Sequence, residues 1–78
     1  MISICLLGAS GSIGNQTLDV MKRHPLDFIL TAFSVGHQVN KIPSILKSFP
    51  SVRMICVQEE KAAEKYHKLF PHLHFFHG

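Results

Sequence analysis

Four short runs of mostly apolar residues alternate along the chain with three segments in which apolar residues recur every three or four positions. A short apolar run that ends at glycine or proline is typical of a strand buried on both faces, and the longer period is typical of an amphipathic helix. The runs predict strands over residues 2–7, 28–35, 52–57 and 73–76. The periodic segments predict a helix that follows the glycines directly and ends before Pro25, with Ile13, Leu18 and Met21 among its recurring apolar residues. Two more helices are predicted over residues 40–49 and 59–70.

This order, β-α-β-α-β-α-β, predicts an α/β fold with a parallel sheet and right-handed crossovers. A complete dinucleotide-binding fold consists of two such halves. The chain therefore predicts the first half of a Rossmann-type parallel sheet. Because the sequence stops on an apolar strand without a following helix, we expect it to be truncated.

Composition supports a packed core within a single domain, because 46% of the 78 residues are hydrophobic and 17% are charged. The net charge of +3 is scattered, which suits an anionic small ligand and gives no basic stripe for a nucleic acid. Cys5 and Cys56 each lie in an apolar run, so we expect buried free thiols in a reducing compartment. With no signal peptide or membrane segment visible, we expect a cytoplasmic protein with neither a membrane nor a nucleic-acid partner.

The glycine-rich segment Gly8-Ala9-Ser10-Gly11-Ser12-Ile13-Gly14 follows the first predicted strand and opens the first predicted helix. In that context Gly8 permits a tight turn, Gly11 leaves room for a pyrophosphate, and Gly14 lets the helix pack closely. The free N–H groups of the helix start then point toward the anion. The segment predicts a dinucleotide phosphate site; a glycine-rich turn without a ligand is the alternative.

The end of the second predicted strand decides which dinucleotide is bound. NAD-specific folds place an acidic residue there to bind the ribose hydroxyls. This chain has Gly36-His37-Gln38 instead, with no acidic residue between Asp27 and Glu59 and with Lys41 nearby. A carboxylate at this position would repel the 2′-phosphate of NADPH, so its absence favours NADPH. The alternative is that His37 and Gln38 only form a solvated turn.

Specific stretches of the sequence resemble the opening of the 1-deoxy-D-xylulose 5-phosphate reductoisomerase family. The resemblance is carried by LGASGSIG at residues 7–14, QTLDV at 16–20, His24-Pro25, AFSVG at 32–36 and His77-Gly78. It implies NADPH-dependent conversion of 1-deoxy-D-xylulose 5-phosphate to 2-C-methyl-D-erythritol 4-phosphate in non-mevalonate isoprenoid biosynthesis. Ser10 stands where the family frequently has threonine, and His37-Gln38 replaces its usual Lys-Asn.

The resemblance also implies which residues bind the cofactor. Carried over residue by residue, the NADPH contacts are Ser10, Gly11, Ser12, Ile13, Gly36, His37 and Gln38. The family's divalent metal, Mg or Mn, and its sugar phosphate substrate are held by residues beyond this chain. Residues 1–78 are thus expected to form a partial NADPH-binding Rossmann domain, without the catalytic and carboxy-terminal domains and without activity alone. The full-length protein is expected to be a homodimer.

The sequence leaves two alternatives to the interpretation as part of a reductoisomerase. One is a part of another NADP-dependent oxidoreductase, of the short-chain or epimerase type, and the other is a nucleotide-binding module without chemistry. The six histidines suggest no metal site, because no carboxylate or cysteine lies among His72, His74 and His77 to complete a ligand set. Asp19 lies too far from Glu59 along the chain to form a catalytic carboxylate pair with it.

Overall fold

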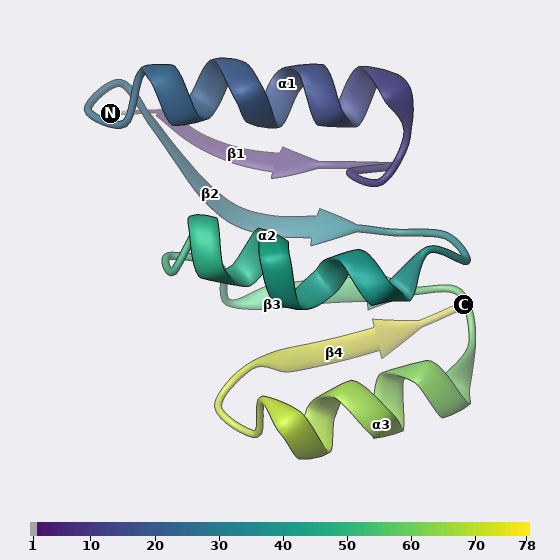
Figure 1. Cartoon of the computed structure of the whole chain (residues 1–78). Helices are drawn as coiled ribbons and strands as arrows, with labels where there is room; N and C mark the ends of the chain where they lie inside the picture. The colour runs from purple at the N-terminus through teal and green to yellow at the C-terminus, as the bar shows by residue number, and fades with distance from the viewer. Residues whose placement is uncertain (1) are drawn as a thin grey trace.

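Four parallel strands and three helices alternate along residues 2–78, which are the residues described by this computed structural model (Figure 1). The elements are β1 (Ile2–Leu6), α1 (Ser12–Arg23), β2 (Phe28–Ser34), the short 3-10 turn η1 (Val39–Lys41), α2 (Ile42–Ser48), β3 (Met54–Val57), α3 (Glu60–Leu69) and β4 (His74–His77). The predicted α/β class and order are confirmed, with element ends that differ by at most three residues. The one internal difference is at residues 40–49, where η1 precedes α2 and Pro43 lies in the first turn of α2.

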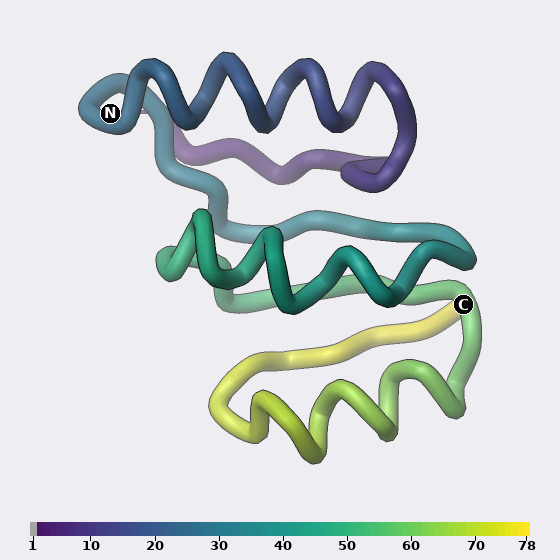
Figure 2. Tube along the Cα trace, viewed as in Figure 1, coloured from purple at the N-terminus to yellow at the C-terminus, as the bar shows by residue number. Residues whose placement is uncertain are grey.

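The strands pair in the order β1-β2-β3-β4, each parallel to the next. Because the strands are parallel, their carboxyl ends share one edge, and the connections that follow β1, β2 and β3 all lie on the same side of Figure 2. The order of the strands in the sheet is the same as their order in the sequence, so among the described residues β1 has a strand neighbour on one side only. The carboxyl edge is where open α/β sheets bind ligands.

All three helices cover the same face of the sheet. One continuous core contains buried side chains of every helix, such as Leu18, Ile45 and Tyr66, together with Phe33 of β2 and Ile55 of β3. Right-handed crossovers that all advance in one direction place their helices on one face, which explains this arrangement. The sheet therefore has one covered and one open face in the described part of the chain.

The prediction of strands buried on both faces was wrong for this reason. In β3, Ile55 and Val57 are buried whereas Met54 and Cys56 are exposed. Cys5 is also exposed, so both cysteines are free as expected but neither is buried. Apolar residues in a strand are buried only when something packs on their face, and here only the helix side is packed.

We expect truncation of β3 side chains to have opposite consequences on the two faces. Ile55→Ala removes a fully buried side chain and should lower the free energy of unfolding by about 2–5 kcal/mol. Met54→Ala, next in the chain and 45% exposed, should change it by less than about 1 kcal/mol. Urea unfolding followed by circular dichroism measures both; equal losses would contradict the one-sided core.

Candidate functional site

The turn after β1 is held against the end of β2. Gly8 has a φ of +70°, a left-handed conformation that glycine adopts without strain, as the predicted tight turn requires. Its N–H donates a hydrogen bond to Ser34 Oγ at 2.9 Å, and the N–H of Ala9 donates to the Ser34 carbonyl at 2.8 Å. These bonds fix the glycine-rich loop at the carboxyl edge of the sheet.

Gly14 is where the first turn of α1 meets that loop. A Cβ atom at Gly14 would lie 2.2 Å from the carbonyl oxygen of Gly8 and 2.8 Å from Ala9 backbone atoms. The prediction that Gly14 allows close packing is therefore confirmed, with the backbone at the end of β1 as the contact. A Cβ at Gly11 would instead lie 3.5 Å from Gly8 O, an ordinary contact, so the backbone at Gly11 stays open on its outer side.

The start of α1 presents free backbone N–H groups above this loop. Gly11 is the N-cap and no side chain caps the first turn, which also contains no acidic residue. The N–H groups of Ser12, Ile13 and Gly14 have no intrahelical partner, because they precede the first helical hydrogen bond, from Asn15 N–H to Gly11 O at 2.9 Å. With the positive end of the helix dipole added, the arrangement suits a phosphate.

Ile13 shows where helical periodicity misled the sequence interpretation. Its position in the repeat placed it with Leu18 and Met21 on the apolar face of the helix. Leu18 and Met21 are buried, but Ile13 is 79% exposed beside the open loop. Ile13 lies in the first turn of α1, so it borders the candidate site and takes no part in the core.

The end of β2 contributes the exposed residues Gly36, His37 and Gln38, which connect β2 to η1. The Nδ1 atom of His37 lies 3.7 Å from Oε1 of Glu59, and both side chains are largely exposed. The sequence argument found no acidic residue near this position and so missed Glu59. The signal was available: Glu59 follows β3, and the carboxyl ends of neighbouring parallel strands lie side by side.

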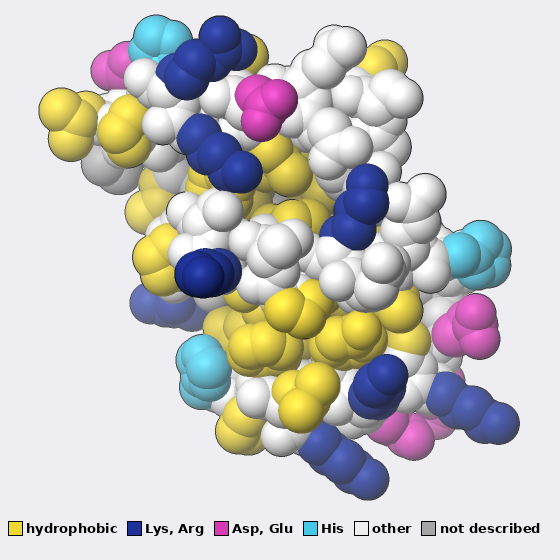
Figure 3. Space-filling view, viewed as in Figure 1, with side chains coloured by type: hydrophobic (Ala, Val, Ile, Leu, Met, Phe, Trp, Pro, Cys, Tyr) yellow, Lys and Arg dark blue, Asp and Glu magenta, His cyan; other side chains and the backbone are white. Residues whose placement is uncertain are grey.

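Lys41 joins the two segments of the predicted site. Its Nζ donates a hydrogen bond to the carbonyl oxygen of Ser10 at 3.4 Å, from the end of η1 to the glycine-rich loop. Lys41 also lines a groove of about 370 Å³ between α1 and α2, and Figure 3 shows Lys and Arg side chains along the face that carries these helices. The structure thus brings Ser10 close to the connection after β2, as the predicted site requires.

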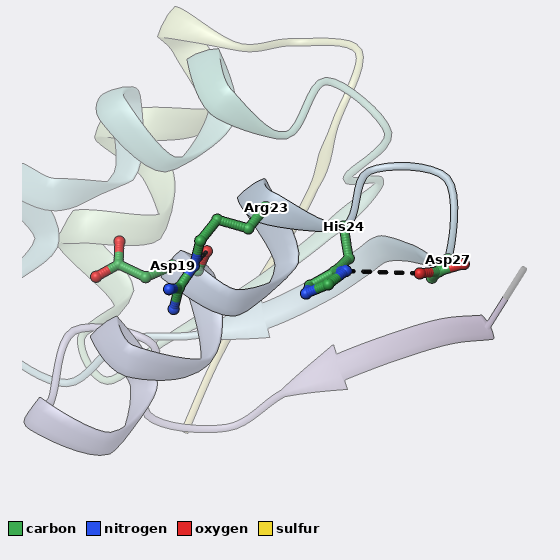
Figure 4. Close-up of polar contacts among 4 residues, drawn as sticks. All are labelled: Asp19, Arg23, His24 and Asp27. Atoms are coloured by element: carbon green, nitrogen blue, oxygen red, sulfur yellow. Dashed lines mark hydrogen bonds and ion pairs between the residues drawn. The ribbon is translucent and has the colours of Figure 1, made fainter.

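Other polar side chains lie away from this edge. Figure 4 shows the pair of His24 Nδ1 and Asp27 Oδ2, 3.7 Å apart, in the turn that leads into β2 at the opposite edge of the sheet. Arg23 in the same view donates to the backbone carbonyl of Asp19 at 3.4 Å. Across residues 2–78, no three His, Cys, Asp or Glu side chains are grouped as a metal site would need. None of the described helices is long and apolar enough to span a membrane.

A parallel sheet whose first strand runs through a glycine-rich turn into an uncapped helix is the arrangement found in dinucleotide-binding folds of the α/β class. The profile of the 1-deoxy-D-xylulose 5-phosphate reductoisomerase family matches residues 4–77. The chain therefore belongs to this family, which decides against an oxidoreductase of the short-chain or epimerase type.

Relatives of the same name support the assignment. The reductoisomerase of Geobacillus sp. (strain WCH70) is 48% identical over 62 residues, which are 80% of this chain and 16% of that protein. That of Bacillus pumilus (strain SAFR-032) is 45% identical over 69 residues, or 88% of this chain and 17% of that protein. This chain thus spans about a sixth of the length of the relatives that it matches.

Solved structures of the family have the same fold. One such structure is a reductoisomerase in complex with NADPH, fosmidomycin and magnesium. The superposition covers 100% of this chain and 20% of the reductoisomerase chain, with a TM-score of 0.85 and 25% identity. The Zymomonas mobilis enzyme in complex with NADPH covers 99% of this chain and 21% of its own, with a TM-score of 0.83. At 19% identity the second comparison shows the fold alone.

We expect Gly14→Ala to disrupt the loop where Gly11→Ala does not. The Gly14 methyl group would overlap the Gly8 carbonyl, so this variant should lose about 3 kcal/mol of unfolding free energy, at the upper end of overpacking costs. Gly11 has a φ of −80°, which alanine accepts, and its variant should change by less than about 1 kcal/mol. Urea unfolding of both variants checks the pair, and equal stability of the two would refute the close approach at Gly14.

Proposed function

We propose that this chain is the NADPH-binding part of a 1-deoxy-D-xylulose 5-phosphate reductoisomerase. The observation that carries the proposal is the open space beside the backbone of Gly11, next to the uncapped first turn of α1. Family membership supports it, because structures bearing the family name were solved in complex with NADPH. Residues 1–78 then form a partial Rossmann domain of a longer protein, since the aligned residues make up only 16% of the Geobacillus relative.

The residues present fit the cofactor. In the proposed complex, the N–H groups of Ser12 and Ile13, with the Ser10 and Ser12 hydroxyls, bind the pyrophosphate over Gly11. Gly36, His37 and Gln38 then border the adenosine ribose, as expected of the connection after the second strand. The seven residues come from the glycine-rich loop with the first turn of α1 and from the connection after β2, which the Ser34 hydrogen bonds and the Lys41–Ser10 contact hold together.

The chain's own contribution to the reaction is to bind and orient. NADPH supplies the hydride when bound. The rigid turn at Gly8 and the close contact at Gly14 fix the helix start, so the N–H groups need no rearrangement to meet the anion. The sugar phosphate site and the metal site are proposed to lie in the part of the family's length that this chain does not span. The homodimeric full-length state and the cytoplasmic location stay predictions.

NADPH binding by a Gly11 variant tests the proposal. Titration of protein with NADPH, followed by nucleotide fluorescence, should show saturable binding that Gly11→Ala weakens about tenfold or more, because overpacking costs about 1–3 kcal/mol. Urea unfolding of the same variant guards against a folding defect. Equal NADPH affinity of the variant and the unmodified chain would overturn the assignment of the pyrophosphate site to Gly11.

We further expect the 78-residue chain to show no turnover by itself. With 1-deoxy-D-xylulose 5-phosphate, NADPH and magnesium present, absorbance at the nicotinamide band should stay constant, because a binding half-sheet lacks the substrate and metal sites. A full-length family member serves as the positive control. Substrate-dependent oxidation of NADPH by this chain would show that the rearrangement site lies within residues 1–78.

A further inference from the structure

Two potential cations flank the end of β2, and the structure separates their roles. His37 faces Glu59, with Nδ1 and Oε1 3.7 Å apart. A protonated His37 is therefore compensated by the adjacent carboxylate, and a neutral His37 leaves that carboxylate in excess. In neither state does the pair offer a net positive charge to an anion.

Lys41 is placed differently. Its ammonium group reaches the Ser10 carbonyl of the phosphate loop at 3.4 Å, and its side chain is partly buried. No carboxylate of residues 2–78 lies within 4.0 Å of it, since the two ion pairs of the described chain belong to His24 and His37. An ammonium group has three N–H donors, and this contact uses one, so two remain for a phosphate.

The surroundings of Lys41 also favour an anion. It lines the groove between α1 and α2 together with Lys22 and Asp19, two cations against one anion. Ser44 and Ser48 also line this groove. Lys41 ends η1, the turn that follows the connection after β2, and this connection is where a Rossmann-type sheet places the adenosine ribose.

We propose that Lys41, and not His37, supplies the positive charge that binds the 2′-phosphate of NADPH. The inference rests on the proposed function, because the position of the ribose follows from cofactor binding at the glycine-rich loop. Lys41 is then the residue that determines specificity for NADPH over NADH in this chain. Glu59, beside His37, is left to face solvent or the ribose hydroxyl at position 3′.

The test uses two nucleotides that differ only in the 2′-phosphate. Adenosine 2′,5′-bisphosphate and 5′-AMP both occupy the adenosine half-site, which is the half that a β-α-β-α-β unit forms. Calorimetric or NMR titration gives their affinities for the unmodified chain and for Lys41→Gln, Lys41→Arg, His37→Gln and Lys47→Gln. Lys47→Gln is the matched control, since it removes the same charge from α2, the helix that follows η1, and Lys47 lies outside the groove.

We expect Lys41→Gln to weaken binding of the bisphosphate about tenfold, as the loss of a charge-assisted hydrogen bond predicts, with little effect on 5′-AMP. Lys41→Arg, which retains the charge, should preserve the preference, and Lys47→Gln should not alter it. A preference that survives in Lys41→Gln but is lost in His37→Gln would overturn the inference and leave the proposed function intact. Failure of the unmodified chain to bind both nucleotides and NADPH would contradict the proposed function and the inference together.

Discussion

The close contact between Gly14 and the backbone of Gly8 and Ala9 is the constraint on which the site depends. It places the first turn of α1 directly over the turn that ends β1, at a distance where any side chain at residue 14 would overlap main-chain atoms. Because the helix start is fixed there, its free N–H groups lie next to the glycine-rich loop. The hydrogen bonds from Gly8 and Ala9 to Ser34 then fix the same turn to β2.

The parallel topology extends this local constraint into a site built from several segments. Because the strand ends share one edge, the loop after β1 meets the connection after β2, and the connection after β2 meets Glu59 after β3. The Lys41–Ser10 and His37–Glu59 contacts both cross between these segments. Polar groups that are distant in sequence are thereby gathered on one edge, while the core on the helix face remains free of buried polar side chains among the described residues.

Much of this arrangement was predictable from the sequence because it depends on local patterns. Apolar runs located the strands, and the glycines at positions 8, 11 and 14 predicted a turn, an opening and a close approach, as the structure has them. What failed depends on neighbours in space. The burial of Cys5 and Cys56 was wrong because it requires a covering layer on the second face, and Glu59 was missed because its proximity to His37 arises only from strand pairing. Periodicity likewise could not show that Ile13 lies in the first turn of α1, beside the loop and outside the core.

The central claim is that the cofactor binds at the carboxyl edge, over the glycine-rich loop. The most direct measurement is the change in backbone amide chemical shifts of the ¹⁵N-labelled chain as NADPH is added. The account predicts that the largest changes occur at Gly11, Ser12 and Ile13, followed by the connection at residues 36–38. Changes confined to the open face of the sheet or to α3, or no change at saturating NADPH, would contradict it.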